Sequence, residues 1–187
     1  MKPTETDLAP GLLIALPKMQ DDNFAGSVVL LIEHGSDGAM GLIVNRPAEG
    51  PELTDVARSH DLTLDDSITD LSIYQGGFVE AERGFLLHNS GEIPDSIPVM
   101  PGVYLASTVE SLDRILTRSN GADFKLCLGY AGWSTGQLER EICEGLWLPA
   151  PATSQCIFDR DIGHSWENAL RTAGIEPGVL LKSTGRQ

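Results

Sequence analysis

The five residues at positions 132–136 read Gly-Trp-Ser-Thr-Gly, which matches the G-x-S-x-G pattern of a serine nucleophile. This pattern lies between a predicted strand and a predicted helix, the setting in which a nucleophile elbow exposes its serine. Asp159 or Asp161 and then His164 follow along the chain, in the order of the α/β-hydrolase triad. The residues therefore describe a candidate hydrolase in which His164 would activate Ser134.

Three features of the chain argue against this hydrolase. Ser134 also fits a helix N-cap with Gln137 as its capping-box partner, so a structural role explains the same residue. Only 51 residues follow Gly136, whereas an α/β-hydrolase needs a largely parallel sheet and a further strand for the acid. A pattern with three fixed positions also arises by chance in a chain with 20 glycines. We expect no catalytic residue and keep a serine hydrolase using Ser134 and His164 as the alternative.

The histidines, cysteines and glycines lack the spacing of a metal or dinucleotide site. His34 and His88 each end a predicted strand, and the chain has no HxH, HxxH or HExxH pattern. We expect these two imidazoles to hydrogen-bond to the backbone. The glycines within residues 35–41 precede a strand rather than a helix, unlike those of a dinucleotide-binding loop. The sequence therefore predicts no metal and no cofactor.

Two segments have residues suited to binding a ligand. The first segment has an arginine at the end of a strand, and a proline after it fixes the direction in which the chain leaves the strand. Such an arginine can present its guanidinium to a carboxylate or phosphate of a ligand. The alternative is that it forms a structural ion pair within the protein. Residues 129–141 combine small residues with aromatic and polar ones at a strand-to-helix turn, where the alternative is close packing of glycine. The predicted ligand-binding residues are Asn45, Arg46, Gly129, Tyr130, Trp133, Gln137 and Glu141.

These candidates must be positioned by strands and short helices. The β-branched run 27–34 predicts a central strand covered on both faces, and an Asp-Gly turn leads it into a returning strand over 41–45. Residues 71–75 and 84–88 predict a second hairpin. Further strands are expected over 124–132 and at Cys156-Ile157-Phe158.

Helices are predicted after Pro51, after Ser107, after Ser134 and from Ser165. Ser107 and Glu110 fit a capping box, and the apolar face of that helix comprises Val109, Leu112, Ile115 and Leu116. The hairpins followed by alternating strands and helices predict one domain over residues 1–187, of the α+β or α/β class with a mixed sheet. Residues 1–7 and 183–187 are expected to be flexible.

The overall charge limits the partners of the chain. Its 187 residues include 27 acidic and 13 basic ones, for a net charge of −14. Such a chain repels nucleic-acid phosphates and anionic lipids, so we expect neither direct nucleic-acid binding nor membrane docking. No apolar run approaches the ~18 residues of a membrane span. The three cysteines form no CxxC pair and are expected to be reduced and buried, which fits a cytoplasmic protein.

The acidity is concentrated in one part of the chain. Residues 49–95 contain 11 acidic residues and two basic ones, Arg58 and Arg83, for a net charge of −9. This acidic segment is either a solvated face or a surface for a basic partner.

The same segments resemble the YqgE/AlgH family of bacterial proteins. The matching stretches are GLLIALPKMQDDNFAGSVVLLIEH, GAMGLIVNRP, YQGGFVEAERGFLLH, LGYAGWSTGQLEREI with WLPAPA, and IFDRDIGHSWENAL. The resemblance implies a bent mixed sheet approaching a barrel, with helices packed outside. It supplies no mechanism, although some members have a transcriptional-regulator label. In the family the positions of Ser134 and Thr135 vary among small residues, and Phe78 stands where proline is usual.

Together these observations favour a non-enzymatic module that binds a small ligand or a protein partner and has a regulatory role. A DNA-binding regulator is disfavoured because the sequence has no recognition helix with a basic face.

Overall fold

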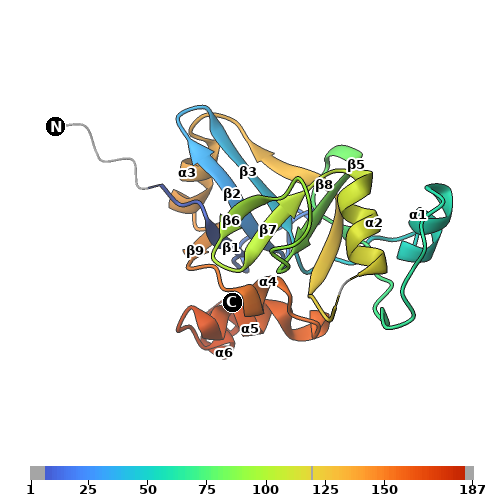
Figure 1. The fold of residues 1–187 in the computed structure, drawn as a ribbon. Coiled ribbons are helices and arrows are strands. Elements are labelled where there is room, and N and C mark those ends of the chain that lie inside the picture. Colours follow the sequence, from blue (N-terminus) through green and yellow to red (C-terminus); the bar gives the residue numbers. More distant parts are fainter. Residues whose placement is uncertain (1–6, 119, 184–187) are drawn as a thin grey trace. The chain divides into compact units, whose positions relative to one another are not determined.

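The computed structural model describes residues 7–118 and 120–183, and they form two compact units (Figure 1). Unit 1 comprises residues up to Asn45 and from Ala131, and unit 2 comprises Arg46–Tyr130. The strand β8 (Phe124–Trp133) begins in unit 2 and ends in unit 1. Most of the predicted flexible residues lie outside the described ones. Of the others, Asp7 accepts a hydrogen bond from the Ala9 amide, and Ser183 ends a helix.

Unit 1 is built on antiparallel strands whose neighbours follow the order β9, β1, β2, β3 and the end of β8. Their bounds are β1 (Gly11–Ala15), β2 (Val28–Gly35), β3 (Gly38–Ile43) and β9 (Trp147–Ala150). The first four residues of β2 are fully buried on both faces, so the prediction of a central, twice-covered strand is confirmed. Gly41 lies opposite Leu31, and a Cβ there would be 2.7 Å from the Leu30 carbonyl oxygen.

Helices cover this part of the sheet. They are α3 (Gln137–Cys143), α4 (Ser154–Ile157), the 3-10 turn η1 (Ile162–His164), α5 (Ser165–Thr172) and α6 (Pro177–Ser183). The helix α5 packs against β1 and β2, and its Trp166 indole donates to the Ala15 carbonyl at 2.7 Å. Gly174 follows the end of this helix with φ +80°, the left-handed conformation that favours glycine there.

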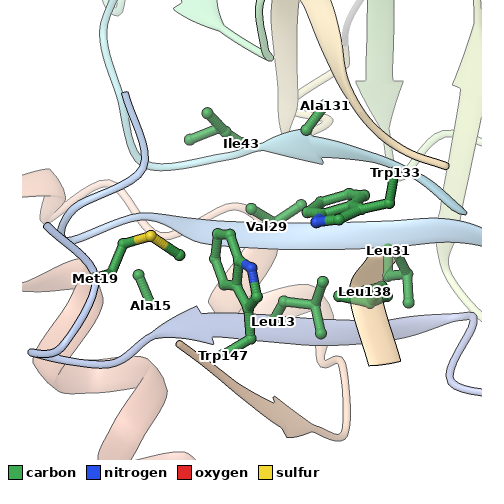
Figure 2. Packing of buried hydrophobic residues seen from close by; sticks show 10 residues of the cluster. All are labelled: Leu13, Ala15, Met19, Val29, Leu31, Ile43, Ala131, Trp133, Leu138 and Trp147. Carbon is green, nitrogen blue, oxygen red and sulfur yellow. The ribbon is translucent and has the colours of Figure 1, made fainter. Parts of the chain in front are cut away.

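One apolar cluster of unit 1 contains side chains from alternate positions of β1 and β2 (Figure 2). Leu13 and Ala15 of β1 meet Val29 and Leu31 of β2, and α3 contributes Leu138. The indole rings of Trp133 and Trp147 lie among these side chains. All three tryptophans of the chain, Trp166 included, therefore belong to unit 1.

In unit 2 the strand neighbours follow the order β6, β7, β5 and β8, all antiparallel. The bounds are β4 (Tyr74–Gln75), β5 (Val79–His88), β6 (Ile97–Met100) and β7 (Val103–Ala106). The strand β4 runs parallel to β8, which makes the sheet mixed. The α+β class and the mixed sheet are thus confirmed.

The predicted hairpin of residues 71–75 and 84–88 is wrong. Cys127 of β8 pairs with Tyr74 of β4 on one side and with Phe85 of β5 on the other. The two segments therefore flank β8 instead of pairing with each other. The helices of this unit are α1 (Leu53–Ser59) and α2 (Val109–Thr117).

Several local predictions also differ from the structure. Thr108, not Ser107, caps α2, because its hydroxyl accepts the Ser111 amide at 3.1 Å. Leu112, Ile115 and Leu116 are buried as predicted, whereas Val109 is 48% exposed. Residues 156–158 are not a strand, because a Thr153 cap begins the short helix α4 there. Of the cysteines expected to be buried, Cys143 is exposed at the end of α3.

Candidate functional site

Glu141 on α3 is held by three side-chain donors. The indoles of Trp133 and Trp147 donate to the same carboxylate oxygen, Oε2, at 2.9 and 2.8 Å. The amide of Gln137, one turn earlier on the helix, donates to Oε1 at 2.9 Å. We call these four residues the Glu141 network. Charged acceptors make the stronger hydrogen bonds, so the carboxylate satisfies two indoles that the core would otherwise leave unpaired.

Ser134 extends the Glu141 network. Its amide and its hydroxyl both donate to Oε1 of Gln137, at 3.0 and 3.2 Å. Gln137 thus reaches back as a capping-box residue does, although Gly136, with φ +71°, is the N-cap and not the predicted Ser134.

The aromatic rings of this network are packed and not open to a ligand. Trp133 and Trp147 are 6% and 2% exposed, and their rings meet edge to face with centroids 5.9 Å apart. Phe24 closes the group, with its ring centroid 5.7 Å from that of Trp147. Of the seven predicted ligand-binding residues, the structure brings together Trp133, Gln137 and Glu141, and their polar atoms bind one another.

The other four predicted residues make the following contacts with the backbone or with neighbouring rings. Asn45 accepts the Val28 amide at 2.8 Å and donates to the Gly26 carbonyl at 2.9 Å, which ties a loop of unit 1. In unit 2 the Arg46 carbonyl accepts the amide of Gln75 at 2.8 Å. Tyr130, also in unit 2, meets the Phe85 ring edge to face.

Gly129 is needed for close approach of two backbone segments of unit 2. Its φ is +68°, and a Cβ at this position would be 2.5 Å from the Gly77 carbonyl oxygen. The predicted alternative of close packing is therefore what the structure has, against residues 77–81 rather than against the next helix.

The proposed triad residues are engaged by their sequence neighbours. The Ser134 hydroxyl donates to Gln137, and the His164 ring pairs with the Asp161 carboxylate at 3.0 Å. The hydrogen bond and charge of Asp161 raise the pKa of His164, which is exposed. The described hydrogen bonds therefore give Ser134 a neutral amide partner and no general base.

His34 links the start of unit 1 to α3. Its Nδ1 accepts the Leu8 amide at 3.2 Å, so Nε2 has the proton and donates to Glu139 at 2.7 Å. Two hydrogen bonds lower the pKa of Glu139. The larger effect comes from the bond to its own backbone and the smaller from the bond to His34. The predicted backbone hydrogen bond is confirmed at Nδ1, whereas the Glu139 partner was not predicted.

His88 is fully buried in unit 2. Its Nε2 lies 2.8 Å from the Ser96 hydroxyl, a side-chain partner that was not predicted. Its ring stacks on Tyr104 with centroids 5.6 Å apart. Among the described residues, no group bonds its buried Nδ1 with good geometry. Burial lowers the pKa of His88, and the Ser90 backbone partly offsets this effect.

Unit 2 also contains a cavity of about 340 Å³ that the sequence did not indicate. Its apolar wall includes Leu86 of β5, Leu112 of α2, and Leu126 and Leu128 of β8. We call it the α1–α2 pocket, because both helices line it. The α1 side contributes Val56, Ser59 and the C-cap residue His60, and the other side is the start of α2. The polar lining is Ser59, His60, Glu82, Ser107 and Thr108.

No group of three or more His, Cys, Asp or Glu side chains suited to a metal ion occurs within residues 7–118 and 120–183. No helix in the described part of the chain is both long and apolar enough to cross a membrane.

Comparison with known proteins identifies the family. The family model DUF179, described as AlgH-like, matches residues 12–178. A UPF0301 protein of Myxococcus xanthus is 41% identical over 96% of this chain and 98% of its own length. A UPF0301 protein of Nitrobacter hamburgensis is 39% identical over 98% of this chain and 89% of its own length.

Two solved structures share the fold. The solution structure of the AlgH protein from Pseudomonas aeruginosa has a TM-score of 0.75, with 32% identity and full coverage of both chains. A crystal structure from Corynebacterium diphtheriae has a TM-score of 0.72, with 21% identity over 91% of this chain and 89% of that chain. The fold, the family model and these relatives agree with the resemblance seen in the sequence motifs, and the chain belongs to the AlgH-like family.

Proposed function

We propose that this protein is a non-enzymatic binding module with a regulatory role, and that the α1–α2 pocket is its ligand site. The pocket itself is the observation that carries the proposal. Its volume of about 340 Å³ is within the range of small-molecule sites. Its leucine walls and few polar groups also match such sites, in which apolar contacts bind and polar contacts orient the ligand.

The geometry favours binding over the alternative of serine hydrolysis. A serine nucleophile needs a base within hydrogen-bond reach, and the hydroxyl of Ser134 instead donates to the amide oxygen of Gln137. A net charge of −14 likewise favours a ligand or protein partner over direct contact with nucleic acid.

A cytoplasmic location and a single-domain organisation are part of the proposal. The free thiols, including the exposed one of Cys143, suit a reducing compartment. The family model spans residues of both units, which supports one domain.

A thermal-shift screen with a small-molecule library tests the proposed site. Ligands of the native state raise its melting temperature, and Val109→Trp should abolish the shift because Val109 lines the pocket and is partly exposed. Val179→Trp is the matched control, since Val179 is 66% exposed on α6. A screen without hits, or hits that survive Val109→Trp, would refute the proposed site.

Fluorophosphonate labelling tests the hydrolase. We expect no labelling that depends on Ser134. Labelling of the wild type that Ser134→Ala removes would establish the enzyme instead.

A further inference from the structure

The α1–α2 pocket has one carboxylate in its lining, that of Glu82. This residue lies in the part of β5 where the pairing register with β8 shifts, between Val79 and Gly84. Among the described residues no ion pair involves Glu82, whereas the neighbouring Glu80 pairs with Arg83 at 3.2 Å. His60 is the other ionisable group among the described residues of the lining. The exposed carboxylate of Glu82 therefore lies at a cavity whose other lining residues, apart from His60, are apolar or uncharged.

The segment that supplies Glu82 and His60 to the pocket is acidic as well. Glu82 and His60 both lie in the acidic segment, whose net charge is −9. The two basic residues of that segment are already engaged, because Arg58 pairs with Asp55 at 3.4 Å and Arg83 with Glu80. Clefts lined by one sign of charge attract ligands of the opposite sign.

One feature of the pocket would favour an anion instead. Ser107, Thr108 and Val109, at the start of α2, line the cavity, and a helix N-terminus is equivalent to roughly half a positive charge. This partial charge is already offset, since Glu110 lies in the first turn and the Thr108 hydroxyl accepts the Ser111 amide. The full charge of Glu82 and its acidic surroundings therefore outweigh the helix dipole.

We propose that the α1–α2 pocket selects a small organic cation with an apolar body, such as an alkyl- or arylalkylammonium. This inference rests on the proposed function, because it names the ligand class of the same site. The apolar body would lie against Leu86, Leu112 and Leu126, and the ammonium would bind the carboxylate of Glu82.

Three probes of similar size and different charge test this inference by NMR titration of the full chain. They are 2-phenylethylamine, 2-phenylethanol and 3-phenylpropanoate. All readouts are the methyl resonances of Val109, Leu112 and Leu126, which line the pocket. Because exposed ion pairs contribute modestly, we expect the amine to bind about threefold to fivefold more tightly than the alcohol, and the carboxylate to bind least.

The variant Glu82→Gln should make the amine bind no better than the alcohol, and binding of the alcohol should not change. Glu80→Gln is the matched control, because Glu80 lies in the same stretch of β5 and is not part of the lining. If the alcohol or carboxylate binds as tightly as the amine, or if Glu82→Gln has no effect, the ligand class is wrong and the pocket stands. If no probe changes the chemical shifts of the methyl groups that line the pocket, both the pocket assignment and the ligand class are wrong.

Discussion

Trp133 and Trp147 donate their indole N–H groups to one and the same oxygen atom, Oε2 of Glu141. The two rings come from different strands and meet edge to face in the core of unit 1. Their shared acceptor belongs to a third element, α3. A single carboxylate therefore fixes the orientation of two large side chains and ties the helix to the strands beneath it.

Removing this acceptor should destabilise the protein. Glu141→Ala leaves two buried indole N–H groups without a partner, and each such loss costs about 1–3 kcal/mol, so we expect about 3 kcal/mol in total. Urea unfolding monitored by circular dichroism measures the change. Glu144→Ala is the matched control, because Glu144 is exposed one turn later on the same helix end. A loss below about 0.5 kcal/mol for Glu141→Ala would contradict the structural role of the network.

Gly129→Ala should cost more than a substitution at an open left-handed glycine. Gly145 has φ +75° with open space around it, so Gly145→Ala should cost about 1 kcal/mol for the backbone conformation alone. At Gly129 the new methyl also meets the Gly77 carbonyl, and overpacking adds about 1–3 kcal/mol. The difference between the two unfolding free energies is the measurement. Equal losses of unfolding free energy in the two variants would show that residues 77–81 move to make room for the methyl group.

Acid should weaken the fold through His88. Because burial lowers the pKa of His88 in the folded state, protons bind the unfolded chain more tightly than the folded one. The neutral His88 therefore contributes fully to the free energy of unfolding at pH values above its ordinary pKa of 6.5. This contribution is lost as the pH falls from 6.5 towards the lowered pKa of the folded state. Urea unfolding from pH 7.5 to pH 5.5 should show this decline. The slope should flatten in His88→Gln and persist in the exposed control His60→Gln. An unchanged slope in His88→Gln would assign the effect to other groups.

One cysteine should react quickly in the native protein. Cys143 is exposed, whereas Cys127 and Cys156 are buried. Burial also raises the pKa of Cys127 to about 12, and the thiolate is the reactive form. Titration with a disulfide reagent should modify one thiol in the folded chain and all three in denaturant. Cys143→Ser should remove the fast phase, and a fast phase that remains would show that a buried thiol becomes accessible.

The sequence predicted those features that depend on interactions between residues close together in the chain. The central strand β2 follows from its β-branched run, and the bond from Ser134 to Gln137 follows from their spacing at the start of α3. The fold class and family followed from such segments and motifs. The predicted caps of α2 and α3 were wrong by one and two residues. For α2 the reason is that adjacent Ser and Thr residues give the same signal, and only the backbone conformation distinguishes them.

Pairing between distant segments could not be predicted in this way. Residues 71–75 and 84–88 follow one another closely in the sequence, which suggested a hairpin, yet both segments pair with β8, much later in the chain. The second indole on Glu141 and the α1–α2 pocket depend on residues from several elements, and no spacing rule connects them. Cys143 was misjudged for a simpler reason, since its type favours burial and its position at the end of α3 decides otherwise.

The aromatic residues provide separate optical reporters for the two units. The three tryptophans lie in unit 1, and the three tyrosines, Tyr74, Tyr104 and Tyr130, lie in unit 2. Excitation at the red edge of the absorption band selects indole emission, so fluorescence follows unit 1 alone. Second-derivative absorbance, which separates the tyrosine band from the overlapping tryptophan band, follows unit 2. Coincident unfolding curves would make the chain one cooperative domain, and separate curves would give each unit its own stability without any introduced label.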